Sequence, residues 1–163
     1  TGLAKPAERP RETQNNRKNK KEDGILVSQK VLLTWLIESE EIFHQIEKYI
    51  TPEDFSEGLF RKVAELLYEQ YEKTEANPAQ IMNHFTDEEE HREVASLFHT
   101  KIKELTTVKE QEKALQETIL RVKDHSIEEA TKNLDPTDIQ GLQRLMNEKR
   151  KMQDLRTLHI SIN

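Results

Sequence analysis

The chain has 163 residues, of which 34% are hydrophobic and 34% are charged, and its formal net charge is −6. This length suits one ordinary domain, or one smaller core with an appendage, and the hydrophobic fraction is low for a single large core. The lack of cysteine excludes disulfides, thiolate zinc sites and thiol nucleophiles, and favours a cytoplasmic location. No apolar run approaches the roughly 20 residues of a membrane span, so we expect no membrane association.

Residues 1–24 form the first distinct segment. They contain seven basic and four acidic residues, a net charge of +3 that leaves −9 for the remainder of the chain. With two prolines and almost no apolar residue, this segment cannot offset the entropy lost on ordering. We therefore predict a flexible basic linker. An alternative is that the run from Arg17 to Lys21 contacts nucleic acid phosphates.

All nine aromatic residues lie between Trp35 and Phe98, which predicts a compact helical bundle there. Ser28 is expected to cap a helix that is apolar nearly all round and lies in the middle of the fold. Ser39 is expected to cap a second helix. The pair Thr51-Pro52 predicts another helix start, because proline in the first helical position loses no needed hydrogen bond.

Three more helices complete the predicted bundle, which is assigned to residues 25–113. Leu59 to Tyr71 repeats apolar residues at helical spacing and predicts a core helix. Asn77-Pro78 repeats the start pattern. Thr86 is expected to begin a helix whose first turns hold Asp87 to Glu90, since carboxylates favour the positive end of the helix dipole.

The character of the chain changes after Thr107. A narrow apolar stripe runs along a charged helix ~40 Å long, and its interruption at Asp124 to Ser126 suggests a bend. Asp135-Pro136 stops this helix, and the aspartate is expected to cap the next one. Residues 114–163 are therefore predicted to form a helical hairpin. We expect Ile25 to Thr107 to fold without it.

The second arm of the hairpin carries the residues that we predict to bind a partner. Two packed helices each bury one face, and the apolar residues of this arm are spread too widely for one narrow seam. Some of them should therefore remain available to another protein. The candidates are Leu142, Leu145, Met146, Met152, Leu155 and Leu158.

Catalysis has little support in the sequence. The four glycines form no phosphate-binding motif, and no pair of carboxylates stands in the contrasting environments that acid–base chemistry uses. We expect no catalytic residue, no metal site and no cofactor in this chain. One alternative is a small metal-dependent hydrolase that uses His84, His91 and His99 with the acidic cluster at Asp87 to Glu90.

Three runs of sequence together resemble a known family. They are Val27 to Ile37 (VSQKVLLTWLI), Ile50 to Phe55 (ITPEDF) and Leu59 to Tyr68 (LFRKVAELLY). In pattern and order they are similar to the C-terminal domain of bacterial DnaG-type DNA primase, and the likeness covers about Ile25 to the C-terminus. The resemblance implies a bundle followed by a hairpin that docks on the replicative ring helicase of the DnaB type, while the bundle modulates the helicase.

The same resemblance implies that the zinc-binding domain and the metal-dependent polymerase core lie upstream of Thr1. The basic linker would join them to the bundle, and the first residue, Thr rather than Met, suits a piece of a longer protein. Direct nucleic acid binding by the acidic folded part should be weak or absent. The main alternative is the N-terminal domain of a DnaB-type helicase, which also has a bundle followed by a hairpin.

Overall fold

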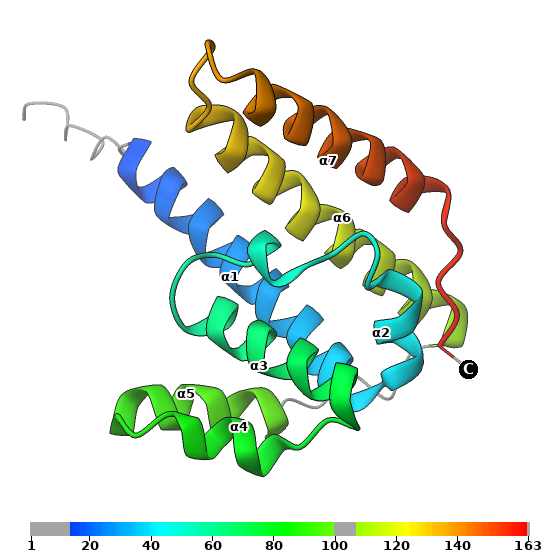
Figure 1. Ribbon diagram of the computed structural model, residues 1–163. Helices are drawn as coiled ribbons and strands as arrows, with labels where there is room; N and C mark the ends of the chain where they lie inside the picture. Colours follow the sequence, from blue (N-terminus) through cyan, green and yellow to red (C-terminus); the bar gives the residue numbers. More distant parts are fainter. Residues whose placement is uncertain (1–13, 100–106, 163) are drawn as a thin grey trace, which may run out of the picture.

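The computed structural model describes residues 14–99 and 107–162. In these residues the chain forms seven α-helices and a short 3-10 helix, η1, and no strand, which confirms the all-α prediction. Helices α1 to α5 and η1 form a bundle, and α6 and α7 form the C-terminal hairpin (Figure 1). The elements are α1 (Gln14–Glu38), α2 (Glu40–Ile46), η1 (Pro52–Asp54), α3 (Leu59–Lys73), α4 (Pro78–His84), α5 (Glu88–His99), α6 (Val108–Lys132) and α7 (Ile139–Thr157). No helix in this part of the chain is long and apolar enough to cross a membrane.

Helix α1 is the central element, as predicted. It packs against α2, α3, α5 and α6, and Leu32, Leu33 and Leu36 are fully buried. However, α1 begins at Gln14 and not at Ser28. The hydroxyl of Ser28 donates to the carbonyl oxygen of Gly24 within the helix, so it caps nothing. The backbone of residues 14–24, predicted to be flexible linker, is therefore helical, and the rest of that linker lies outside the described residues.

Several predicted helix starts are confirmed by their caps. The side chain of Ser39 accepts from the backbone N–H of Ile42 at 3.2 Å, and that of Asn77 accepts from Gln80 at 3.2 Å. Thr51-Pro52 begins only the single turn of η1, closed by a capping box with Asp54. Helix α3 then starts after Gly58, whose φ of 117° suits glycine.

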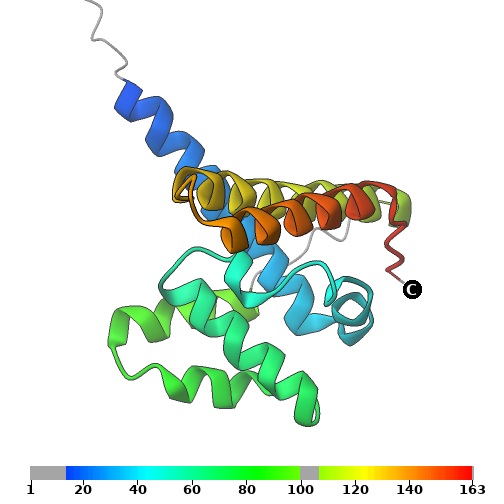
Figure 2. The same cartoon turned by 45° about the horizontal axis from the view of Figure 1, so that its top comes forward.

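The hairpin packs directly on the bundle. Helix α6 lies along α1, and its buried residues Leu115, Ile119 and Val122 join the same hydrophobic core as the bundle helices. Figure 2 shows the two hairpin helices as a layer across the bundle, with the first turns of α1 projecting beyond them. The predicted boundary between residues 113 and 114 thus falls inside α6, and the core is continuous across it.

One local prediction about the hairpin is wrong, because Asp135 does not cap the second helix. Helix α6 continues without a break from Val108 to Lys132, through the position of the expected bend at Asp124 to Ser126, and the hydroxyl of Ser126 donates to Asp54 of η1. The N-cap of α7 is Asp138, whose side chain accepts from the N–H of Gly141 at 3.0 Å. Asp135 instead accepts from the N–H and hydroxyl of Thr137, which lowers its pKa.

The cap assignment leads to a first testable prediction. Replacing Asp138 by alanine leaves a backbone N–H of α7 without its acceptor, and should lower the free energy of unfolding by about 1 kcal/mol. Asp135→Ala, which removes only turn contacts, should cost less. Urea denaturation followed by circular dichroism compares the two variants. If Asp135→Ala is the more damaging change, the turn and not the cap determines where α7 begins.

Candidate partner-docking site

The structure divides the six predicted docking residues between two sides of α7. Leu142 and Met146 are exposed, by 39% and 66%, whereas Leu145, Met152 and Leu155 are buried on the side that packs against α6. Leu158 is half-buried at the end of α7. Partner contact by Leu145, Met152 and Leu155 is therefore not possible in this conformation, because one face of the second arm is already covered by the first. Of the six predicted residues, Leu142 and Met146 are thus exposed in this conformation, and Leu158 is partly accessible.

A third exposed apolar residue, Ile139, extends this surface. It is 70% exposed, and its spacing from Leu142 and Met146 places all three on one side of the helix. We call these three residues the apolar strip. Half of the six large hydrophobic residues that are exposed in the described chain belong to it. Ile139 was absent from the predicted set, although its spacing of three and seven residues from the others was visible in the sequence.

Basic side chains continue the same side of α7 towards its C-terminal end. Lys149 and Arg156 follow Leu142 at seven-residue intervals, and Arg150 follows Met146 by one turn. All three are exposed. Helix α7 carries five basic and two acidic residues, a net charge of +3 in a chain of net charge −6. No aromatic residue accompanies them. The outer face of α7 is thus apolar in its first half and basic in its second.

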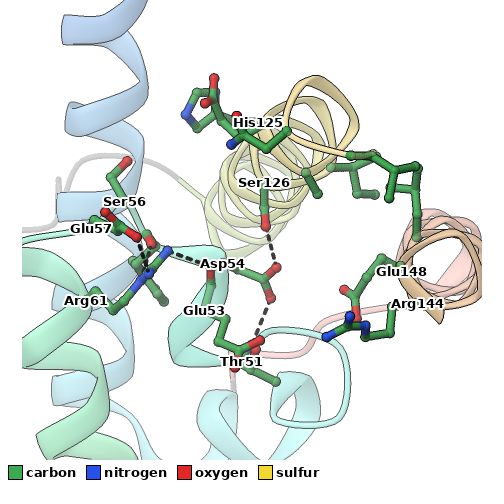
Figure 3. Close-up of a pocket in the computed structure, with 18 of the residues that line it drawn as sticks. Thr51, Glu53, Asp54, Ser56, Glu57, Arg61, His125, Ser126, Arg144 and Glu148 are labelled. Atoms are coloured by element: carbon green, nitrogen blue, oxygen red, sulfur yellow. Dashed lines mark hydrogen bonds and ion pairs between the residues drawn. The ribbon is translucent and has the colours of Figure 1, made fainter. Parts of the chain in front are cut away.

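A cleft of about 710 Å³ lies between the hairpin and the segment around η1. Its walls come from residues 51–61, the second half of α6, the hairpin turn and the first half of α7 (Figure 3). Arg144 and Glu148 project into it from α7, opposite Thr51 and Glu53. Most of its charged groups are carboxylates. Apolar side chains, among them Phe55, Leu134 and Leu145, line the cleft as well, so the first half of α7 and the η1 segment are separated here by a space of mixed polar and apolar lining.

A buried ionic network lies at the inner end of this cleft, and sequence analysis did not predict it. Lys123 of α6 is fully buried, and its Nζ lies 3.2 Å from both carboxylate oxygens of Asp54 and also bonds Glu148 of α7. Asp54 additionally accepts from the hydroxyl of Ser126 at 2.7 Å and from the N–H of Thr51 at 2.9 Å. The network joins η1, α6 and α7.

The network keeps Glu148 ionised. Burial raises the pKa of Glu148, but hydrogen bonds and charge attraction from Lys123, and then from Lys151, outweigh burial and hold the pKa below its ordinary value. Buried Lys123 was detectable in principle, because it lies four residues after the core residue Ile119. Its two acceptors come from distant segments, however, so the sequence could not identify them.

The histidines proposed as metal ligands do not gather into a site that the structure describes. His91 is exposed on α5, and the ring of His84 makes an edge contact with Phe85. The side chain of His99 lies outside the described residues. Among the residues described, no three His, Asp or Glu side chains lie close enough together to hold a metal ion.

The chain was compared with protein-family models, curated proteins and solved structures, and none gives a significant match. The fold class therefore rests on the structure, and any function is a proposal from the residues and geometry of the chain.

Proposed function

We propose that this chain is the helicase-interaction module of a bacterial DNA primase, and that it docks on a DnaB-type replicative helicase through the outer face of α7. The observation that carries the proposal is the apolar strip, Ile139, Leu142 and Met146, followed on the same face by Lys149 and Arg150. An order of bundle and then hairpin is what the resemblance to primase implies, and the described chain has that order.

The chemistry of this face defines the surface that it fits. Burying a large apolar side chain contributes roughly 1.5–3 kcal/mol, so the strip can supply the centre of an interface. The basic residues beside it favour a partner surface with carboxylates at the matching end, and such complementarity sets orientation and speeds association. The expected helicase surface is therefore an apolar groove bordered by acidic residues.

The module would act without chemistry of its own. Its parent would be the RNA polymerase that makes primers in the cytoplasm, with zinc and a divalent metal bound in domains other than this one. Docking would hold that polymerase where single-stranded template leaves the helicase, which raises its effective concentration there. The bundle would modulate helicase activity.

The strip provides the test. Met146→Ala and Leu142→Ala should each weaken binding to the purified helicase by about 2 kcal/mol, roughly thirtyfold, because anchors at the centre of an interface dominate its affinity. Their circular dichroism should not change, since both side chains are exposed. Titration calorimetry gives the affinity. Leu26→Ala is the matched control, because Leu26 is 43% exposed but lies on α1.

Three outcomes would change the proposal. Undiminished affinity of both α7 variants would move the interface away from this face. Tight, salt-resistant binding of single-stranded DNA by residues 25–163 alone would contradict the expectation that the folded part binds nucleic acid weakly. Binding to a DnaG-type primase, and not to the helicase, would favour the alternative identity as a helicase N-terminal domain.

A further inference from the structure

Helix α7 is fixed firmly at its C-terminal end. The side-chain amide of Gln116 donates to the carbonyl oxygens of Leu155, Arg156 and Leu158 at 3.2–3.4 Å. Beyond the helix, Ile160 is buried in the hydrophobic core. The main chain of Ser161 exchanges two hydrogen bonds with the side chain of Gln45, at 2.8 and 2.9 Å. This end of α7 is therefore attached to α6 and to the bundle at once.

The first half of α7, Ile139 to Glu148, is held differently. Leu145 packs on its buried side, but the cleft separates this half from the η1 segment. The tie across the cleft runs from Glu148 through Lys123 to Asp54. Helix α7 packs on α6, and this tie links its first half to the η1 segment, so the position of the first half depends on the tie more than that of the second half does.

The two carboxylates of the network are held unequally: Asp54 is held firmly and Glu148 less so. Asp54 meets Lys123 with both oxygens, is itself buried, and is held further by Ser126 and by the backbone of Thr51. Glu148 meets Lys123 through one oxygen, is 33% exposed, and shares its other oxygen with Lys151. If Glu148 moves away, Lys123 keeps its bonds to Asp54. The separation therefore leaves no buried charge without a partner, which is the costly outcome for ion pairs.

We propose that Glu148 is a latch, closed in this structure, whose release lets the first half of α7 swing away from the η1 segment. The anchored C-terminal end and the hairpin turn would limit the movement. Release would expose Leu145 next to the apolar strip, so a partner that also contacts Leu145 would favour the open form. This last step rests on the proposed docking role of α7, whereas the latch itself is a property of the free chain.

The latch is tested on the free full-length chain. In Glu148→Ala, amide hydrogen exchange of residues 142–148 should accelerate about tenfold or more, because a half-helix that has lost its neighbours breaks its backbone hydrogen bonds more readily, while that of Val63 to Leu67 in α3 stays unchanged. The chain lacks cysteine, so cysteines placed at exposed Gln143 and Glu65 allow spin labelling. The distance distribution between the two labels should broaden. Asp154→Ala, which removes the other carboxylate of α7, an exposed one, should leave both measurements unchanged.

Each result of these measurements either supports the latch or overturns it. Unchanged exchange and distances in Glu148→Ala would overturn the latch, as would exchange that accelerates equally in α3 and α7, which would indicate general destabilisation. Glu148→Gln, which keeps size and loses charge, repeats the test with less risk to folding. The helicase is absent from these measurements, so a failed latch leaves the docking proposal standing. Conversely, a failure of the docking proposal would not affect the exchange and distance measurements, because they are made on the free chain.

Discussion

A chain that ends at Thr107 is expected to lose cooperative thermal unfolding. Such a chain lacks the core residues Leu115, Ile119 and Val122 of α6, and Leu155 and Ile160 beyond them, which pack with α1 in one cluster. Losing five buried apolar side chains removes roughly 10 kcal/mol of burial free energy at about 2 kcal/mol each. That loss is comparable to the total stability of a domain, about 5–15 kcal/mol.

Differential scanning calorimetry of the truncated chain checks this expectation, with near-ultraviolet circular dichroism to report on the packing around Trp35. A chain that ends at Thr157 is the control, because it loses only the tail with Ile160 and keeps α6 and α7. A sharp transition in the shorter chain would instead support the expectation from sequence that Ile25 to Thr107 fold alone.

The second large effect is expected at Asp54. Asp54→Ala leaves Lys123 fully buried with Glu148 as its one carboxylate, and it also removes the acceptor of Ser126 and of the Thr51 N–H. Removing one partner of a buried ion pair costs about 3–5 kcal/mol, since the remaining charge is poorly compensated. Urea denaturation should show a loss of this size.

A double variant separates charge from packing. Asp54→Ala combined with Lys123→Met removes the poorly compensated charge of Lys123 while keeping most of the volume of its side chain, and should recover part of the lost stability. If the double variant is as unstable as the sum of the two single variants, the two residues do not act as a pair. The loss of stability in Asp54→Ala would then come from the lost cap of η1.

Local features were predictable where the role of a residue depends only on its neighbours in the sequence. Ser39 and Asn77 cap helices because a short polar side chain satisfies an unpaired N–H, and that chemistry depends only on neighbouring residues. The extension of α1 to Gln14 was missed because burial was used as the criterion. Lysine, arginine, glutamate and glutamine are good helix formers without burial.

The docking face was only partly predictable, for a geometric reason. The sequence shows that α7 has more apolar residues than one seam requires, but the direction of α6 decides which of them are covered. Leu145 and Met146 are neighbours in sequence, and their exposed fractions differ from 8% to 66%. The ionic network was hidden for a related reason: Asp54 and Lys123 meet across 69 positions in the chain.

The packing of α1 against α6 has a consequence for the synthesis of the protein. Leu33 emerges from the ribosome about 85 residues before Ile119, which at ordinary translation rates is an interval of roughly 4 to 17 seconds. During that interval the side of α1 that α6 will cover remains exposed, because its partner does not yet exist. We expect the nascent chain to be most prone to aggregation, and most in need of a chaperone, during those seconds.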